Sequence, residues 1–164
     1  MIPANRQRNY LQSALYVAIV GVLAAVLLER LLTYAEVAEK AAMEATVSRL
    51  GNALYARLAM LALRGEHEAI EALPGQSPFA VAHATSPAYL GEFDSLPPNA
   101  EGGRWYFDRA RRELVYLPNL KRYLEGAEHM PALRFRVEVQ EASKYAYTGV
   151  ILRPVGAVSW DPRP

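Results

Sequence analysis

The stretch Ile19–Leu32, IVGVLAAVLLERLL, begins as an uninterrupted apolar run and passes directly into a charged pair, Glu29 and Arg30. It belongs to a longer segment, Tyr10–Leu28, that contains no charged side chain. As a helix with a rise of 1.5 Å per residue, this segment spans roughly 28 Å, which is about the hydrocarbon thickness of a bilayer. The stretch therefore predicts a helix that crosses a membrane once.

The charges on either side of this segment predict its orientation. Arg6 and Arg8 precede it, whereas charges of both signs follow it, so the positive-inside rule places the N-terminus in the cytoplasm. We expect a single-pass membrane protein whose C-terminal part faces outward. A cleaved signal peptide is the alternative, but its apolar region is shorter, roughly 7 to 15 residues, and TYA at residues 33–35 is a poor cleavage site.

The composition limits the remaining classes of protein. The chain has 164 residues, of which 52% are hydrophobic, and a formal net charge of +1, which fits one small domain plus an apolar segment. Because phosphate binding requires clustered Lys and Arg, nucleic acid is not expected as a partner. The absence of cysteine excludes a disulfide, a thiolate zinc site and a thiol nucleophile.

The helix is expected to continue well beyond the membrane. No proline occurs between Pro3 and Pro74, and Gly65 after Arg64 is typical of a helix C-cap. We expect the apolar face of this half to be buried on the protein's own domain, with a coiled-coil or partner-helix seam as the alternative. The residues that define the face recur at spacings of three and four: Met43, Val47, Leu50, Leu54, Leu58 and Leu61.

The amino-acid composition changes after Arg64. Residues 65–103 are rich in Pro, Gly and Ser after a short helical turn, which predicts a mostly irregular connection. We expect four apolar side chains to pin this connection to the core: Tyr89, Leu90, Phe93 and Leu96.

Strand patterns follow the connection. RWYFD and ELVYL flank the polar turn RARR and predict an antiparallel hairpin, Arg104–Leu117. In LRFRVEVQ, residues 133–140, apolar and polar side chains alternate, which predicts a strand with one buried face. YAYTGVILRPV and AVSW are expected to form a fourth strand and a short edge piece. The cross-strand pairs of the hairpin should come from Trp105, Phe107, Leu114 and Tyr116.

These elements predict an α+β fold in which one long N-terminal helix packs on a small C-terminal antiparallel sheet. The expected parts are a cytoplasmic segment (1–9), the transmembrane half of the helix (10–28), its periplasmic amphipathic half (29–64), the connection (65–103) and the sheet (104–164).

This layout resembles the type IV pilin fold shared by pilins and type II secretion pseudopilins. The segment AIVGVLAAVLL, residues 18–28, is itself similar to the N-terminal segment of that family, in which small and aliphatic residues surround a glycine. The resemblance covers nearly the whole chain in layout but only about fifteen residues in motif, and such residues are common in membrane helices. It implies a non-catalytic component of type IV pilus or type II secretion pseudopilus biogenesis.

The departures from the family pattern concern processing. Aligned on Gly21, the chain has Gln7 in place of the glycine that ends the family's leader, Arg8 at the new N-terminus and Gln12 in place of the family's glutamate. Glu29 replaces the proline that often interrupts the family's helix. The resemblance therefore implies an unprocessed, pilin-like protein that stays in the inner membrane, similar to accessory components encoded with MSHA-type pili or related secretion systems.

Two surfaces are candidates for contact with other pilin-like subunits and inner-membrane assembly proteins. Small residues at spacings of three and four permit close helix approach in lipid, and a polar residue near them can hydrogen-bond a partner helix. The second candidate is the basic hairpin turn, with Arg109, Arg111 and Arg112 as docking residues. An alanine-rich anchor that faces only lipid is the alternative to the first. The helix–helix candidates are Gln12, Ala14, Ala18, Gly21 and Ala25.

Catalysis is not expected. The three histidines do not share a helix face, and a pair such as His67 and Glu71 is more often a solvated surface than a metal site. Asp108 and Glu113 bracket the hairpin turn, where turn and strand-end chemistry is the simpler role. No phosphate-binding glycine loop or nucleophile elbow occurs in the sequence, so neither enzyme activity nor a cofactor or metal is expected.

A different class of function competes with the pilin-like one. A generic single-pass inner-membrane protein with a periplasmic sensor or scaffold domain requires no fixed relation between span and domain, so a flexible linker can join them. Residues 29–64 lack linker composition, which favours a rigid helix through both parts.

Overall fold

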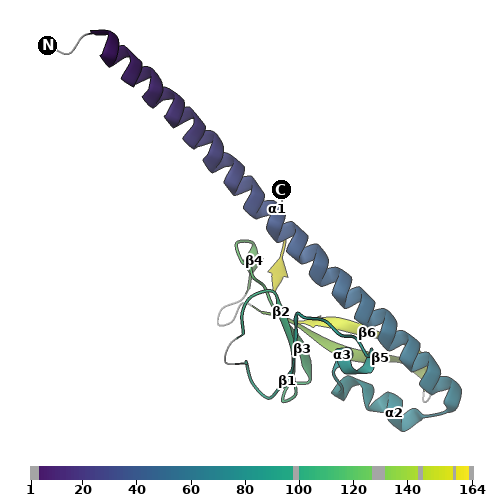
Figure 1. Cartoon of the computed structure of the whole chain (residues 1–164). Helices are drawn as coiled ribbons and strands as arrows, with labels where there is room; N and C mark the ends of the chain where they lie inside the picture. Colours follow the sequence, from purple (N-terminus) through teal and green to yellow (C-terminus); the bar gives the residue numbers. More distant parts are fainter. Residues whose placement is uncertain (1–3, 98–99, 127–131, 144–145, 157, 163–164) are drawn as a thin grey trace.

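The computed structural model describes residues 4–97, 100–126, 132–143, 146–156 and 158–162. A single helix, α1 (Ala4–Arg64, 61 residues), runs through the predicted transmembrane segment and on along the domain, and its first half extends away from the rest of the chain (Figure 1). Gly65 ends the helix with φ of 70°, and the Glu66 N–H donates back to the Leu61 carbonyl at 3.0 Å. The expected continuity of the helix and its glycine cap are confirmed.

The expected irregular connection contains more structure than its composition predicted. After α1 come a short helix α2 (His67–Glu71), a 3-10 turn η1 (Leu73–Gly75), a further short helix α3 (Pro78–Val81) and a strand β1 (Tyr89–Phe93). β1 does not alternate in burial, and its register with its neighbour shifts near Gly91, whose φ is 113°. Because β1 is irregular, its sequence lacks the alternation of apolar and polar residues by which strands are predicted.

The sheet is mixed, so the prediction of an antiparallel sheet is wrong in this respect. Its order is β1-β2-β3-β5-β6, with β2 (Arg104–Asp108), β3 (Glu113–Leu117), β5 (Leu133–Ser143) and β6 (Ala146–Val155) paired antiparallel. β1 joins the edge parallel to β2, because the loop between them returns the chain to the same end of the sheet. A separate ribbon pairs β4 (Leu124–Glu125) with β7 (Ser159–Trp160).

The β2–β3 hairpin has the predicted bounds and pairs. Trp105 lies opposite Tyr116 and Phe107 opposite Leu114, and these four side chains enter the core that faces α1. The other face of the hairpin is also buried, because Tyr106 and its neighbours pack under the residues of β1. In β5, Leu133, Phe135 and Val137 are buried whereas the alternate positions are partly or fully exposed, as the alternation predicted.

The apolar face of α1 packs on the domain, as expected. Met43, Leu50, Leu54, Leu58 and Leu61 are all buried, each adding roughly 1.5–3 kcal/mol by removing its side chain from water. Two clusters result, one around the aromatic residues of the hairpin and one around η1, β5 and β6.

Three of the four residues expected to pin the connection do so. Tyr89, Leu90 and Phe93 pack against core clusters. Leu96 does not, since its side chain is 41% exposed beyond the end of β1.

Candidate interaction surfaces of helix α1

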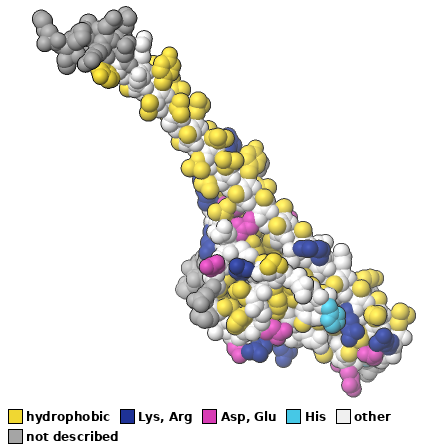
Figure 2. Space-filling model, in the orientation of Figure 1, with side chains coloured by type: hydrophobic (Ala, Val, Ile, Leu, Met, Phe, Trp, Pro, Cys, Tyr) yellow, Lys and Arg dark blue, Asp and Glu magenta, His cyan; other side chains and the backbone are white. Residues whose placement is uncertain are grey.

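The apolar, N-terminal half of α1 is not covered by the residues that the structure describes. It is long and apolar enough to span a membrane, and none of its most apolar window is buried inside the described structure. The core helix of a soluble protein passes the same length test but is mostly buried, unlike this window, whereas a signal sequence near the N-terminus passes it as well. Figure 2 shows yellow hydrophobic side chains, interspersed with white atoms, along the part of this half that projects from the domain.

The structure brings four of the five candidate contact residues to one face of this half. Ala14, Ala18, Gly21 and Ala25 follow one another at spacings of three and four, and all are exposed. Space near Gly21 is open, with no atom within 4 Å of an added Cβ. Gln12 does not join them, because nine residues of helix place it about 180° around the axis from Gly21. The four small residues are called the small-residue face below.

The small-residue face lies on the same side of α1 as the domain. Gly21 and Glu39 are about five whole helical turns apart, and so are Ala25 and Met43. Met43 is buried in the domain core and Glu39 is bonded to the domain. A helix packed on the small-residue face would therefore lie in the membrane beneath the domain.

A buried carboxylate fixes the domain to α1 about 12 Å beyond the apolar segment. Glu36 is 0% exposed, and its Oε1 accepts hydrogen bonds from the Trp160 indole N–H at 2.8 Å and from the Tyr123 backbone N–H at 3.2 Å. Its Oε2 is buried with no hydrogen-bond partner in the described part of the chain. The bonds tie β7 and the loop before β4 to the first turns of α1 beyond the apolar segment.

A second carboxylate, one helical turn further on, also bonds the domain to α1, and the two carboxylates together form the joint between them. Glu39 accepts the Tyr116 hydroxyl at 2.8 Å and the backbone N–H groups of Asn119 and Leu120 at 2.6 and 3.1 Å. Burial raises the pKa of Tyr116, and the hydrogen bond to Glu39 raises it further. Five hydrogen bonds to two carboxylates therefore hold α1 and the domain in one orientation.

A further exposed face on the outer half of α1 was missed from the sequence. It lies opposite the buried apolar face and contains no charged residue between Leu31 and Leu63. The leucine pattern marks only the buried face of the helix. The residues of the exposed face recur at the same spacings of three and four, so the sequence does contain a signal for it. This outer face comprises Tyr34, Ala38, Ala41, Ala45, Ser48, Asn52, Tyr55 and Ala59, all exposed.

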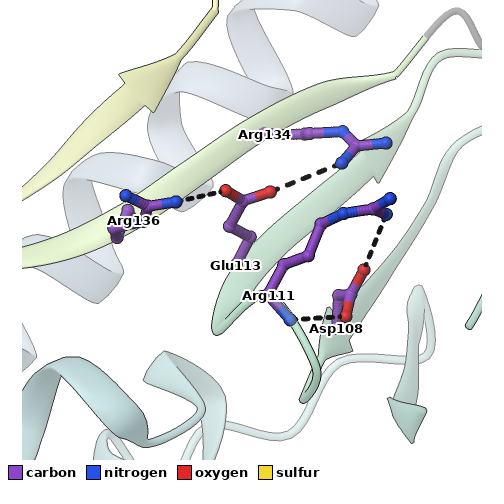
Figure 3. A network of polar contacts seen from close by, with 5 residues as sticks. All are labelled: Asp108, Arg111, Glu113, Arg134 and Arg136. Atoms are coloured by element: carbon purple, nitrogen blue, oxygen red, sulfur yellow. Dashed lines mark hydrogen bonds and ion pairs between the residues drawn. The ribbon is translucent and has the colours of Figure 1, made fainter. Parts of the chain in front are cut away.

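The basic hairpin turn is largely neutralised by its neighbours. Arg109 donates through Nε and Nη2 to both carboxylate oxygens of Asp94, at 3.0 and 2.9 Å. Arg111 bonds the buried Asp108 through its backbone N–H and its guanidinium, at 3.0 and 3.3 Å (Figure 3). Arg112, at φ of 56°, is the one candidate of the three without an ion pair among the described residues.

Glu113 completes the charged edge of the hairpin. It is buried and accepts hydrogen bonds from Arg134 at 3.4 Å and Arg136 at 2.7 Å, both on the adjacent strand β5 (Figure 3). Asp108 and Glu113 therefore do the turn and strand-end work that the sequence indicated, and each balances the charge of neighbouring arginines.

No catalytic arrangement is evident in the described parts of the chain. His67 contacts Tyr147, with the ring centroids 6.0 Å apart. Among the residues that the structure describes, no three His, Asp or Glu side chains lie close enough to hold a metal ion. A groove of about 400 Å³ between α1 and the segment after α3 has Arg49 at its edge and Phe79 in its wall, with no acid or histidine in its lining. His129 lies outside the described residues.

The fold and these surfaces define an α+β domain carried on one long, apolar N-terminal helix. Comparison with known proteins found no matching family model, no matching curated protein and no matching solved structure.

Proposed function

We propose that this chain is a non-catalytic, membrane-anchored, pilin-like subunit that takes part in the biogenesis of a type IV pilus or a type II secretion pseudopilus. It spans the inner membrane once, with its N-terminus in the cytoplasm and its domain in the periplasm. The observation that carries the proposal is the continuity of α1, which runs from a half long and apolar enough to span a membrane into the domain core without a break. A subunit that assembles through its helix needs such a rigid connection.

The joint at Glu36 and Glu39 supports this proposal over the generic sensor or scaffold. A tethered sensor tolerates a flexible linker, whereas here charge-assisted hydrogen bonds begin about 12 Å beyond the apolar segment. Rotation of the membrane half is therefore transmitted to the domain. The domain's orientation depends on which face of the span meets a neighbour.

The partners we propose are other pilin-like subunits and inner-membrane assembly proteins, with the lipid bilayer as the medium. The small-residue face permits close contact in lipid, where packing drives helix association. The outer face offers a second uncharged surface beyond the membrane, on the opposite side of the helix. One straight partner helix cannot cover both faces, so the two faces serve two neighbours, as assembly in an array requires.

The experiment that tests this proposal enlarges the small-residue face. The variant carries four substitutions: Ala14→Leu, Ala18→Leu, Gly21→Leu and Ala25→Leu. It should no longer co-purify with pilin-like partners, because the helices can no longer approach closely. Pilus or secretion function should be lost as a result. Membrane insertion and domain folding should be unchanged. The matched control exchanges bulky residues on the opposite face, Ile19→Leu, Leu23→Ile and Val26→Leu, and should keep assembly intact.

Exchange of the whole span, Tyr10–Leu28, for an unrelated anchor of equal length gives a second test. Loss of assembly with a folded, correctly oriented domain supports recognition through the span. Assembly that survives both changes would make α1 a tether, and the partner contact would then have to lie on the outer face or the domain.

A further inference from the structure

A groove of about 400 Å³ lies between the outer half of α1 and the segment that follows α3. Thr46, Arg49 and Leu50 line it on the α1 side, and residues 84–87 line the opposite side. Arg49 lies about 32 Å beyond Leu28 along the helix, so with α1 across a bilayer the groove is well outside the lipid headgroups. A ligand of this groove therefore comes from solution and not from the bilayer.

The wall opposite α1 is held in place by the chain's own hydrogen bonds. The Ala84 N–H donates to the Phe79 carbonyl at 3.0 Å, which closes the end of α3, and His83 between them has φ of 47°. At the other end of the wall, the Pro87 carbonyl accepts a hydrogen bond from the Arg104 guanidinium at 2.6 Å. The groove is therefore already formed without a ligand, and binding does not require a loop to become ordered.

The inside of the groove is mostly apolar. Leu50 and Phe79 are core residues, and Phe79 stacks on Tyr89 with the ring centroids 4.2 Å apart, which fixes the floor. Small side chains in the walls leave the space open, so an aliphatic group that fills it is removed from water. These wall residues are three half-buried alanines, Ala53, Ala82 and Ala84.

One positive charge lies at the edge of the groove without a counter-ion. Arg49 is exposed, and none of the described residues forms an ion pair with it. No acid occurs three or four residues before or after it on α1, and none lines the groove. Its Nη2 donates to the Thr46 hydroxyl at 3.2 Å, and that hydroxyl donates to the Ala42 carbonyl at 2.9 Å. The guanidinium is therefore held beside the groove, and it has further N–H donors for a ligand.

The donors at the groove suit a ligand with one negative charge. Besides Arg49, Thr85 and Ser86 contribute hydroxyl groups to the lining. Ser86 Oγ accepts the Ala88 N–H at 3.2 Å, so its own hydrogen remains for another acceptor. A carboxylate matches this set, because arginine can donate two parallel hydrogen bonds to it. The volume of the groove is within the range of about 300–1,000 Å³ that is typical of small-molecule pockets.

We propose that this groove binds a small aliphatic carboxylate. The carboxylate pairs with Arg49 and accepts hydrogen bonds from Thr85 and Ser86, and the aliphatic body lies against the three alanines. The site goes beyond the pilin-like role and requires no partner subunit, so the two proposals stand or fall separately.

The test captures a tethered ligand in the full-length protein. The chain has no cysteine, so Ala53→Cys, in the wall of the groove, supplies a single thiol. In phosphatidylcholine nanodiscs, this thiol exchanges reversibly with equal amounts of mercaptobutanoate and mercaptobutanamide, which have the same length and differ in charge. Mass spectrometry of the intact protein measures the two adducts. Relative to N-acetylcysteine amide, the protein should favour the carboxylate roughly fivefold, which is the effect of one ion pair at a surface.

The decisive comparison uses two arginines at equal spacing from the new thiol. Arg49 and Arg57 each lie four residues from position 53 on α1 and both are exposed, but only Arg49 lines the groove. Arg49→Gln should remove the preference for the carboxylate, whereas Arg57→Gln should keep it. Pro87→Cys, on the opposite wall, repeats the measurement from the other side. An equal loss in both arginine variants, no preference at either thiol, or no capture of either probe would overturn the site.

A competition experiment identifies the kind of occupant. Free pentanoate should reduce the excess of the carboxylate adduct, and pentanamide should not. Competition by the peptide acetyl-Ala-Glu-Ala-amide without competition by pentanoate would assign the groove to an acidic side chain of a partner protein and would overturn the small-molecule site.

Discussion

Trp160 donates its indole N–H to Glu36 at 2.8 Å, across 124 residues of sequence. The bond is fully buried and joins β7 to the first part of α1 beyond its apolar segment. Because Glu36 also accepts the Tyr123 N–H, this one carboxylate holds both sides of the β4–β7 ribbon against α1. The orientation of the domain on its anchor therefore depends on this residue.

Replacement of Glu36 should test that role. Glu36→Ala leaves two buried donors without an acceptor and should lower the free energy of unfolding by about 2–5 kcal/mol. Glu36→Gln keeps an acceptor and should cost less. Chemical denaturation of the detergent-solubilised chain, followed by tryptophan fluorescence, measures the change. The control Glu44→Ala removes an exposed carboxylate from the same helix and should change stability by less than about 0.5 kcal/mol; equal effects in the two variants would contradict the role of Glu36.

The raised pKa of Tyr116 predicts a loss of stability in alkali. The folded-state pKa lies above the ordinary value of 10.0, so above that pH the unfolded chain gives up the proton first. The unfolded state then binds fewer protons than the folded state, and stability falls as pH rises through this window. Tyr116→Phe should make the fall less steep without abolishing it, because burial also raises the pKa of Tyr89 and Tyr106.

Denaturation midpoints from about pH 8 to pH 11.5 measure this slope. Tyr55→Phe, at an exposed position on α1, is the matched control and should leave the slope as it is. A slope that Tyr116→Phe does not alter would show that the Tyr116–Glu39 bond plays no part in alkaline unfolding.

Trp105 should be the most sensitive position of the hairpin. It is 3% exposed, and its ring centroid lies 4.6 Å from that of Tyr116 and 6.0 Å from that of Phe135. Trp105→Ala should destabilise the domain by roughly 3–5 kcal/mol, because the space left behind cannot close fully. A thermal melt measures it, with Leu63→Ala, at a side chain 89% exposed, as the control. An unchanged melting temperature would mean that the hairpin does not hold the core together.

Processing gives a further prediction. Because Gln7 and Arg8 stand where the resembled family has its cleavage signal, the protein should keep its N-terminus when it is co-expressed with a prepilin peptidase. Mass spectrometry of the membrane-extracted protein measures this, with a genuine prepilin in the same cells as the positive control. Loss of about the first seven residues would show that the substituted signal is still recognised.

Local patterns were enough to predict α1, the hairpin and β5, because each depends on spacing within one segment. β1 was missed because its parallel pairing with β2 depends on a returning loop and its own register is irregular. Glu36 looked like an ordinary charged residue after a membrane span, and only the fold brings Trp160 to it. Arg109 looked free for the same reason, since its partner Asp94 lies on a different segment. Contacts between segments that are far apart in the sequence leave no residue pattern within either segment from which they could be predicted.

The central claim is that α1 continues as one rigid helix from its apolar half to the part that is buried in the domain core. Because the chain lacks cysteine, Leu23→Cys and Tyr55→Cys, both at exposed positions on α1, accept two spin labels without background. In nanodiscs, pulsed electron–electron double resonance should give one narrow distance distribution near about 48 Å, the rise of a continuous helix between these residues. A broad distribution centred at shorter distances would reveal a hinge in α1 between the two labels and would contradict the claim.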